Sequence, residues 1–385
     1  MTDTINLSNT GILHKLIIIR MSLNIKFLKT EQIDKVLHFF NNTQSDKERV
    51  FFRPRKEFEW LFVESVIKPS FYVIASDSLS DEIVGTNAGI IIPMLSHLGE
   101  PVLTCKSEDS LLSLDLMIKF GKRDVLKEML DVLEEKYRTD NVNFVWGFTK
   151  AKNSFKRCGY TIHNQVRGSF YVIKPMQFYK YRINQLHHQS IIKKLMLLGF
   201  AWNNCFKQLF LSITFAQFAL KQIRIAEIDE EILKTFLPKN VYTLYLNKEF
   251  LSWRISRNPS SITYGLLEFR DLCGKVISYF IFSYDKGNCY FIEQFLFHEN
   301  LNDKEKIQIM KRAFAFIKKR NATMIRSMGF TDNELNLKEI DLLRKTGFFF
   351  FENKEASYFI LKNINKSYVN AKDIYLSRLN TLGTV

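Results

Sequence analysis

Two phrases of this sequence each occur twice, in the same order and at matching spacing. The first reads KEFEWLF at residues 56–62 and KEFLSWRIS at residues 248–256, each time around a tryptophan, Trp60 or Trp253. About 100 residues after each lysine comes NSFKRCGY or DLLRKTGF, around Gly159 and Gly347. One phrase could recur by chance, but two in the same order and at the same spacing predict a duplicated domain.

Both copies show the same expected elements after the tryptophan. β-Branched and aromatic residues cluster in SFYVIAS and IVGTNAGIIIP of the first copy, and in ITYGLLEF and VISYFIFSY of the second. Asp, Ser and Gly separate the members of each pair, so each copy is expected to hold two strands joined by a turn. Each glycine phrase predicts a helix that ends at a glycine C-cap and leads directly into a strand.

A chain of 385 residues is too long for one ordinary core and suits two domains. We place the first copy at residues 22–175, after a tail without the features of a secretory signal, and the second at 223–385. Residues 176–222 show no strand-turn alternation and read as two helical stretches, SIIKKLMLLGFAWNN and CFKQLFLSITFAQFALK. Since no uncharged span is long enough to cross a bilayer, this segment is a helical connector, which we favour, or an in-plane membrane helix.

Charge and cysteine content narrow the partners and the compartment. A net charge of +15 attracts polyanions, which include nucleic acid, a membrane surface and the phosphates of CoA. The five cysteines are scattered without C-x-x-C or C-x-x-H spacing, which disfavours a zinc site or disulfide framework and favours a reducing, cytoplasmic compartment. His187 and His188 are adjacent, but no further ligands follow at helical spacing, so we expect no metal.

A series of short motifs follows one order along the first copy. They are Trp60 and Phe62, Lys68-Pro69, DEIVG at 81–85, KSED at 106–109, Gly147-Phe148, and Asn153-Ser154 through Gly159-Tyr160. This order resembles the GNAT superfamily of acyl-CoA N-acyltransferases, especially versions found beside bacterial surface-polysaccharide genes. The resemblance covers residues 22–175 well and 223–385 more weakly. It implies an α/β fold of two tandem GNAT-like domains, each a mixed, mainly antiparallel sheet flanked by helices, joined by a helical connector.

In that family, a glycine-rich loop opens a helix whose free N–H groups take the CoA pyrophosphate. At that place this chain has DLMIKFGKRDVLKEML, residues 115–130, with a single glycine. The resemblance implies that acetyl-CoA, or another acyl-CoA, is bound there by Lys119, Gly121, Lys122, Arg123 and Asn153. The alternative is a basic loop capped by Asp124 ahead of a solvated helix. The matching stretch of the second copy has no glycine and no basic loop, so we do not expect it to bind CoA in the usual way.

Attack on a thioester needs a neutral amine, so a carboxylate near the nucleophile would be useful as a base. The resemblance places Glu108 and Asp109 on the strand that lines the acceptor cleft, with Asp115 closing it. Successive strand residues face opposite ways, so we expect only one of Glu108 and Asp109 to point inward; the alternative is two surface charges. In the second copy, Glu293 stands at a comparable position within CYFIEQFLF, where burial would require a partner.

Two further positions separate this chain from the family pattern. Many members carry a proton-donating tyrosine four residues before the helix-ending glycine, where this chain has Phe155 and Leu343. Water or another group would then protonate the leaving thiolate, or the thiolate would leave unaided.

Trp60 and Trp253 are expected to pack in the core and to anchor a helix on its sheet.

Three classes of function follow from the resemblance. The first is a cytoplasmic N-acyltransferase, acetylating an amine such as an amino sugar of a surface polysaccharide, with a peripheral contact at the inner membrane face left open. The second is a tandem-GNAT, aminoacyl-tRNA-dependent ligase of the peptidoglycan-bridge type, which the positive charge would suit but which the sequence does not support with a long coiled-coil insertion or a basic stripe. Outside this second class we expect no nucleic-acid partner. The third is a binding module that has lost catalysis. The sequence indicates no oligomeric state.

Overall fold

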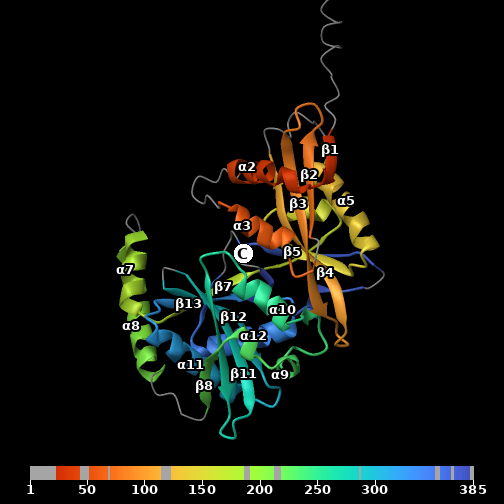
Figure 1. Cartoon of the computed structure of the whole chain (residues 1–385). Helices are drawn as coiled ribbons and strands as arrows, with labels where there is room; N and C mark the ends of the chain where they lie inside the picture. The colour runs from red at the N-terminus through yellow and green to blue at the C-terminus, as the bar shows by residue number, and fades with distance from the viewer. Residues whose placement is uncertain are drawn as a thin grey trace, which may run out of the picture.

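The structure is a computed structural model, and it describes residues 23–43, 52–67, 70–113, 123–185, 191–211, 218–285, 288–351, 356–365 and 368–381. The chain forms two α/β lobes, each built on one mixed sheet with helices on its faces, and a helical hairpin stands beside the second lobe (Figure 1). This confirms the fold class predicted from the sequence. None of the helices in the described ranges has the length and apolar content needed to cross a bilayer.

The first half of the chain builds most of one sheet, in the order β1-β2-β3-β4-β5-β15-β6, with β9 paired to β3. All its neighbours are antiparallel except β4 and β5. The elements of this half of the chain are β1 (Leu23–Phe27), η1 (Thr30–Gln32), α2 (Ile33–Thr43), α3 (Arg55–Phe58), the π-helical turn η2 (Glu59–Val63), β2 (Phe71–Asp77), β3 (Ile83–Leu95), β4 (Pro101–Leu112), α5 (Val125–Thr139), β5 (Phe144–Thr149), α6 (Lys152–Arg157), β6 (Thr161–Gln165) and β7 (Arg167–Val172). The two strands expected after Trp60 are β2 and β3.

The second half repeats the plan in the sheet β14-β7-β13-β12-β11-β10-β8, in which only β12 and β13 run parallel. The elements of this half of the chain are β8 (Ala219–Ile223), η3 (Ile225–Glu227), α9 (Glu230–Thr235), β9 (Thr243–Leu244), α10 (Lys248–Leu251), the π-helical turn η4 (Ser252–Ser256), β10 (Thr263–Arg270), β11 (Val276–Tyr284), β12 (Cys289–Phe297), α11 (Asp303–Lys319), β13 (Met324–Gly329), α12 (Glu334–Thr346), β14 (Phe349–Phe351), β15 (Tyr358–Asn363), η5 (Ala371–Asp373) and η6 (Arg378–Thr381). Gly347 caps α12 in the left-handed conformation at φ 107°, as its phrase predicted.

Each sheet takes strands from the other half of the chain: the first sheet takes β9 and β15, and the second sheet takes β7. β7 lies between β13 and β14 of the second sheet, and β15 lies between β5 and β6 of the first. Lys362 of β15 pairs with Glu134 of α5 and donates to the Cys158 carbonyl at 2.7 Å. The domain boundaries predicted at residues 175 and 223 therefore do not coincide with the division between the two sheets. Where one domain ends and the next begins stays a prediction.

The repeated tryptophans meet each other between the lobes. Trp60 lies in η2 and Trp253 in η4, and their rings stack with centroids 5.0 Å apart. The Trp60 Nε1 donates to the Trp253 carbonyl at 2.9 Å, and the Trp253 Nε1 donates to the Trp60 carbonyl at 3.1 Å. A reciprocal contact of this kind is what a local twofold axis produces. Both rings are buried as expected, but what each one anchors is the other copy.

The segment between the copies is helical at first and then becomes a strand. α7 (Pro175–Gln185) and α8 (Ile191–Leu211) pack against each other as a hairpin. The first predicted helical stretch lies in α8. The prediction was wrong for the end of the second helical stretch, because residues 219–221 belong to β8, which pairs with β10 in the second sheet. β-Pairing to an available sheet edge has overridden the apolar spacing that indicated a helix.

Candidate active site

Strands β4 and β5 stay paired only through residues 105–107 and then diverge. At the last rung Gly147 faces Ser107, and a Cβ on Gly147 would lie 3.1 Å from the Ser107 carbonyl oxygen, so a side chain there would push the strands apart. Just past this rung the register between β3 and β4 shifts, and Asp109 has a left-handed φ of 50°. The bulge interrupts strand alternation at the two predicted acids.

Asp109 is held in an ion pair with Arg53, and both side chains are only 3% exposed. The Tyr72 hydroxyl donates to Asp109 at 3.3 Å, and the Arg53 guanidinium lies over the Phe40 ring at 4.6 Å. Burial, followed by the nearby Asp109, raises the pKa of Tyr72 well above its usual value. Asp109 is therefore enclosed by groups that compensate its charge, which suits a structural anchor better than a proton acceptor.

Glu108 pairs with Lys106 instead, and its side chain is 11% exposed against 1% for Lys106. Burial lowers the pKa of Lys106 well below its usual value, and Arg254 of the second copy acts in the same direction. Arg254 is itself buried, and its Nη1 donates to the Tyr264 hydroxyl at 2.5 Å. The first copy thus has a carboxylate that keeps some access to solvent beside a lysine that favours its neutral form.

Neither acid is a surface charge, because both side chains are paired. The bulge interrupts the strand alternation from which we expected only one of them to point inward, and that expectation stays a prediction. The other predicted residues are less central. Arg123 forms a two-point contact with Glu128 of α5, at 2.5 and 2.9 Å, and Asn153 is exposed on α6. Asp115, Lys119, Gly121 and Lys122 lie outside the described residues, as do Lys68, Pro69, His187 and His188.

The helix after the pyrophosphate-loop position has the cap that the sequence suggested. Asp124 is the N-cap of α5 and accepts from the Lys127 backbone N–H at 3.2 Å. Phe155 and Leu343, which stand where the family has a tyrosine, are both buried in apolar clusters. Neither copy therefore supplies a phenol at that place.

The second copy has the same bulge with a different partner. Its register shift leaves Glu293 unpaired in the β11–β12 ladder, as Asp109 is in the first copy. Glu293 is 1% exposed, pairs with Arg378, and accepts from the Ser283 hydroxyl at 2.5 Å. The partner expected for a buried Glu293 therefore exists, and it comes from the last residues of the chain.

The C-terminal segment, residues 369–381, occupies the diverging part of the second sheet. Its Ser377 hydroxyl donates to Gln294 of β12 at 3.1 Å, and its Leu376 carbonyl accepts from Asn336 of α12 at 2.6 Å. Because it contacts both β12 and the helix that follows β13, it lies across the opening between those strands. Residues 292–296 of β12 are all buried, whereas residues 108–112 of β4 are half-buried or exposed.

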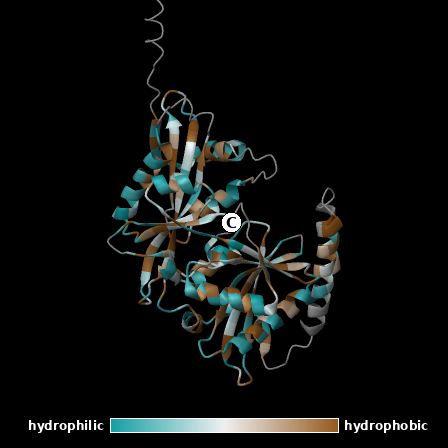
Figure 2. Cartoon of the chain, turned by 180° about the vertical axis from the view of Figure 1, so that it is seen from behind, coloured by the Kyte–Doolittle hydropathy of each residue, from teal (hydrophilic) through white to brown (hydrophobic). Residues whose placement is uncertain are grey.

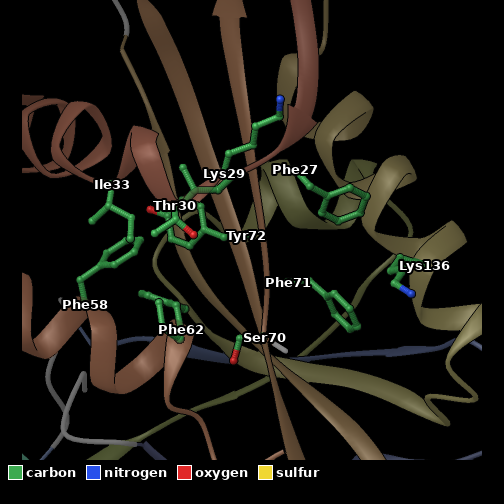
Figure 3. A pocket seen from close by; sticks show the side chains of 12 residues that line it. Phe27, Lys29, Thr30, Ile33, Phe58, Phe62, Ser70, Phe71, Tyr72 and Lys136 are labelled. Atoms are coloured by element: carbon green, nitrogen blue, oxygen red, sulfur yellow. The ribbon is translucent and has the colours of Figure 1, made fainter. Parts of the chain in front are cut away.

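A cavity of about 340 Å³ lies beside the first bulge, where β1 ends at the edge of its sheet (Figure 3). Phe58, Phe62 and Phe71 give it an apolar wall, and Lys29 and Lys136 also line it. Tyr72 lines this cavity and also bonds Asp109, so one side chain joins the cavity to the charged bulge. No group of three His, Cys, Asp or Glu side chains able to hold a metal occurs within the described ranges.

Sequence reasoning missed Arg53, Lys106, Arg254 and Arg378. Lys106 belongs to the KSED motif and Arg254 follows the repeated tryptophan, so both had a signal beside them. Arg53 and Arg378 had none, because each reaches its carboxylate from a segment far away in the sequence.

Comparison with known proteins shows the fold at low sequence identity. No protein-family model and no curated protein matches the chain. A probable N-acyltransferase from Enterococcus faecalis V583 superposes with a TM-score of 0.58 at 10% identity, over 89% of this chain and 73% of that one. Saccharomyces cerevisiae N-myristoyltransferase with bound myristoyl-CoA gives a TM-score of 0.53 at 11% identity, over 88% and 78%. A tandem GNAT protein from the clavulanic acid biosynthesis pathway gives 0.54 at 10%, over 90% of this chain and all of that one. The chain thus has the fold of tandem GNAT proteins.

Proposed function

We propose that this chain is an acyl-CoA-dependent N-acyltransferase, that acetyl-CoA is its first candidate donor, and that the N-terminal copy carries the reaction. The observation that carries the proposal is the difference between the two diverging strand pairs. In the second copy the C-terminal segment lies across the opening. In the first copy, among the described residues, β4 past Ser107 stays partly exposed beside a paired acid and lysine.

Glu108 is the proposed proton acceptor. The attacking amine nitrogen bonds to the acyl carbon, the carbon–sulfur bond breaks, the amine proton passes to Glu108, and water protonates the CoA thiolate. Lys106 holds the Glu108 carboxylate in place. Asp109 is a positioning residue, because Arg53 and Tyr72 enclose it.

The acceptor that the motif order suggests is a primary amine, and an amino sugar of a bacterial surface polysaccharide is our proposal for its class. An amine that is protonated in water would be drawn to the carboxylate of Glu108 before it is deprotonated. The polysaccharide rests on the sequence resemblance alone. A thermal-shift screen separates the acyltransferase from the tRNA-dependent ligase and from the binding module without catalysis. Acetyl-CoA, longer acyl-CoAs and tRNA each raise the melting temperature only of a protein that binds them. A ligand at 100 times its dissociation constant adds about 2.7 kcal/mol.

The CoA site is tested by replacing Lys119, Lys122 and Arg123 with alanine. Each charge-assisted phosphate contact is worth roughly 1.5–3 kcal/mol, so the triple variant should lose most of its CoA affinity in titration calorimetry. A matched control replaces three exposed lysines of the C-terminal half, Lys304, Lys319 and Lys372. Equal affinity in the parent and in the Lys119, Lys122 and Arg123 variant would place CoA elsewhere.

The base is tested by Glu108→Gln, which keeps shape and hydrogen bonding. Loss of a general base commonly costs about 10²–10⁴ in rate, and the loss should shrink at high pH, where the amine is already neutral. Asp109→Asn should instead lower the free energy of unfolding, because it weakens a buried ion pair. A Glu108→Gln variant with the full rate at neutral pH would show that this acid is structural.

A further inference from the structure

The outer face of α8 is apolar and exposed. Ile191 is 73% exposed, Leu195 62% and Met196 70%, and Ile192 and Trp202 are exposed by 65% and 57%. Steps of three, four and seven residues place these five side chains on one side of the helix. We call this set the α8 outer face. A run of five large apolar side chains on one helix face is unlike the scattered exposed apolar residues of an ordinary surface.

The opposite side of α8 accounts for its packing on the protein. Ala201 is fully buried, and Phe200 contacts the rings of Phe170, Phe178 and Phe349. The helix is therefore held to α7 and to the edge of the second sheet by that side, which leaves the outer face without a partner among the described residues. Figure 2 shows the hairpin at the margin of the molecule, with hydrophobic residues on its free flank.

The stretch of sequence that contains this hairpin carries charge of one sign. Between Asp140 and Glu227 the sequence contains no Asp or Glu. The same stretch contains thirteen basic residues: Lys150, Lys152, Lys156, Arg157, Arg167, Lys174, Lys180, Arg182, Lys193, Lys194, Lys207, Lys221 and Arg224. Lys and Arg occur along the whole chain, but this absence of acids concentrates the net positive charge on the segment that carries the apolar face.

We propose that the α8 outer face inserts into the headgroup region of an anionic lipid bilayer, with the flanking basic residues against the lipid phosphates. Exposed apolar side chains, a tryptophan and nearby lysines are the combination that a membrane surface takes up. A second copy of this chain fits the charges poorly, because a symmetric dimer through this face would bring two acid-free segments together.

Trp202 reports on this contact without a label. The other tryptophans, Trp60, Trp146 and Trp253, are at most 4% exposed. Adding vesicles of phosphatidylcholine with phosphatidylserine should shift the emission to shorter wavelength and protect Trp202 from acrylamide. Vesicle co-sedimentation should weaken between 0.1 M and 1 M salt, because the Debye length falls from about 10 Å to about 3 Å.

The variant Ile191→Glu with Leu195→Glu should lower the partition constant by about 100-fold, since each apolar side chain that leaves the bilayer contributes tenfold or more. The matched controls are Leu98→Glu and Leu272→Glu, at turns where the leucines are 76% and 84% exposed, and these should bind as the parent does. Equal binding of the double variant, equal binding to phosphatidylcholine alone, or a Trp202 already shielded from acrylamide without vesicles would each overturn the proposal. The last result would mean that another part of this chain, or a second copy, covers the face.

Discussion

Replacing Arg378 by methionine should show how firmly the C-terminal segment is held in the second copy. Arg378 is 7% exposed, it pairs with Glu293, and its guanidinium lies 4.2 Å from the centre of the Phe291 ring. Without Arg378, Glu293 still accepts a hydrogen bond from Ser283 but has lost its countercharge. Glu293 is only 1% exposed, so water cannot replace that countercharge. Removing one partner of a buried ion pair costs about 3–5 kcal/mol, because the remaining charge stays desolvated. We expect Arg378→Met to lose that much unfolding free energy.

A second substitution separates this cost from ordinary packing loss. In Arg378→Met with Glu293→Met neither charge of this pair remains, so most of the lost stability should return. Urea unfolding followed by circular dichroism measures Arg378→Met, Glu293→Met and the double variant, with Arg344→Met as the control. Arg344 pairs with Asp341 on the surface, where both side chains are more than half exposed, and its loss should cost less than about 1 kcal/mol. The reasoning fails if Arg378→Met behaves like Arg344→Met, or if the double variant loses as much as the two single changes together.

Two more predictions concern the links that hold the copies and the C-terminal segment. Burial raises the pKa of Glu339, which accepts from the Tyr375 hydroxyl at 2.9 Å, to about 7. The folded state therefore keeps a proton that the unfolded state releases from about pH 4.5, and stability falls as the pH rises from there to 7. Glu339→Gln should remove this fall, at most about 3 kcal/mol, between pH 5 and pH 8; an unchanged pH profile of urea unfolding would contradict it. Trp60→Phe and Trp253→Phe should each be destabilising, and their double-mutant cycle should show a coupling of about 0.5–3 kcal/mol. Strict additivity would mean that the stack and its reciprocal hydrogen bonds contribute nothing jointly.

Much of each copy could be predicted because its signals are local. The strands after Trp60 and Trp253 follow from runs of β-branched and aromatic residues between turns. The helix that ends at Gly347 follows from a residue that adopts a left-handed φ without strain. The candidate site was only partly accessible in this way. KSED pointed to Glu108 and Asp109, but strand alternation gave no warning of the bulge that lets both acids be paired.

The sequence by itself determined that the chain holds two copies of one α/β plan, since duplicated phrases and short-range patterns are properties of neighbouring residues. Only the tertiary structure decided which sheet each strand joins, because the period of a strand says nothing about its partner. β7 and β15 therefore lie in the sheet of the other half, and Trp60 meets Trp253 across 193 residues. The same holds for Arg378 on Glu293: a buried charge requires a countercharge, but it can recruit one from anywhere that the folded chain brings near.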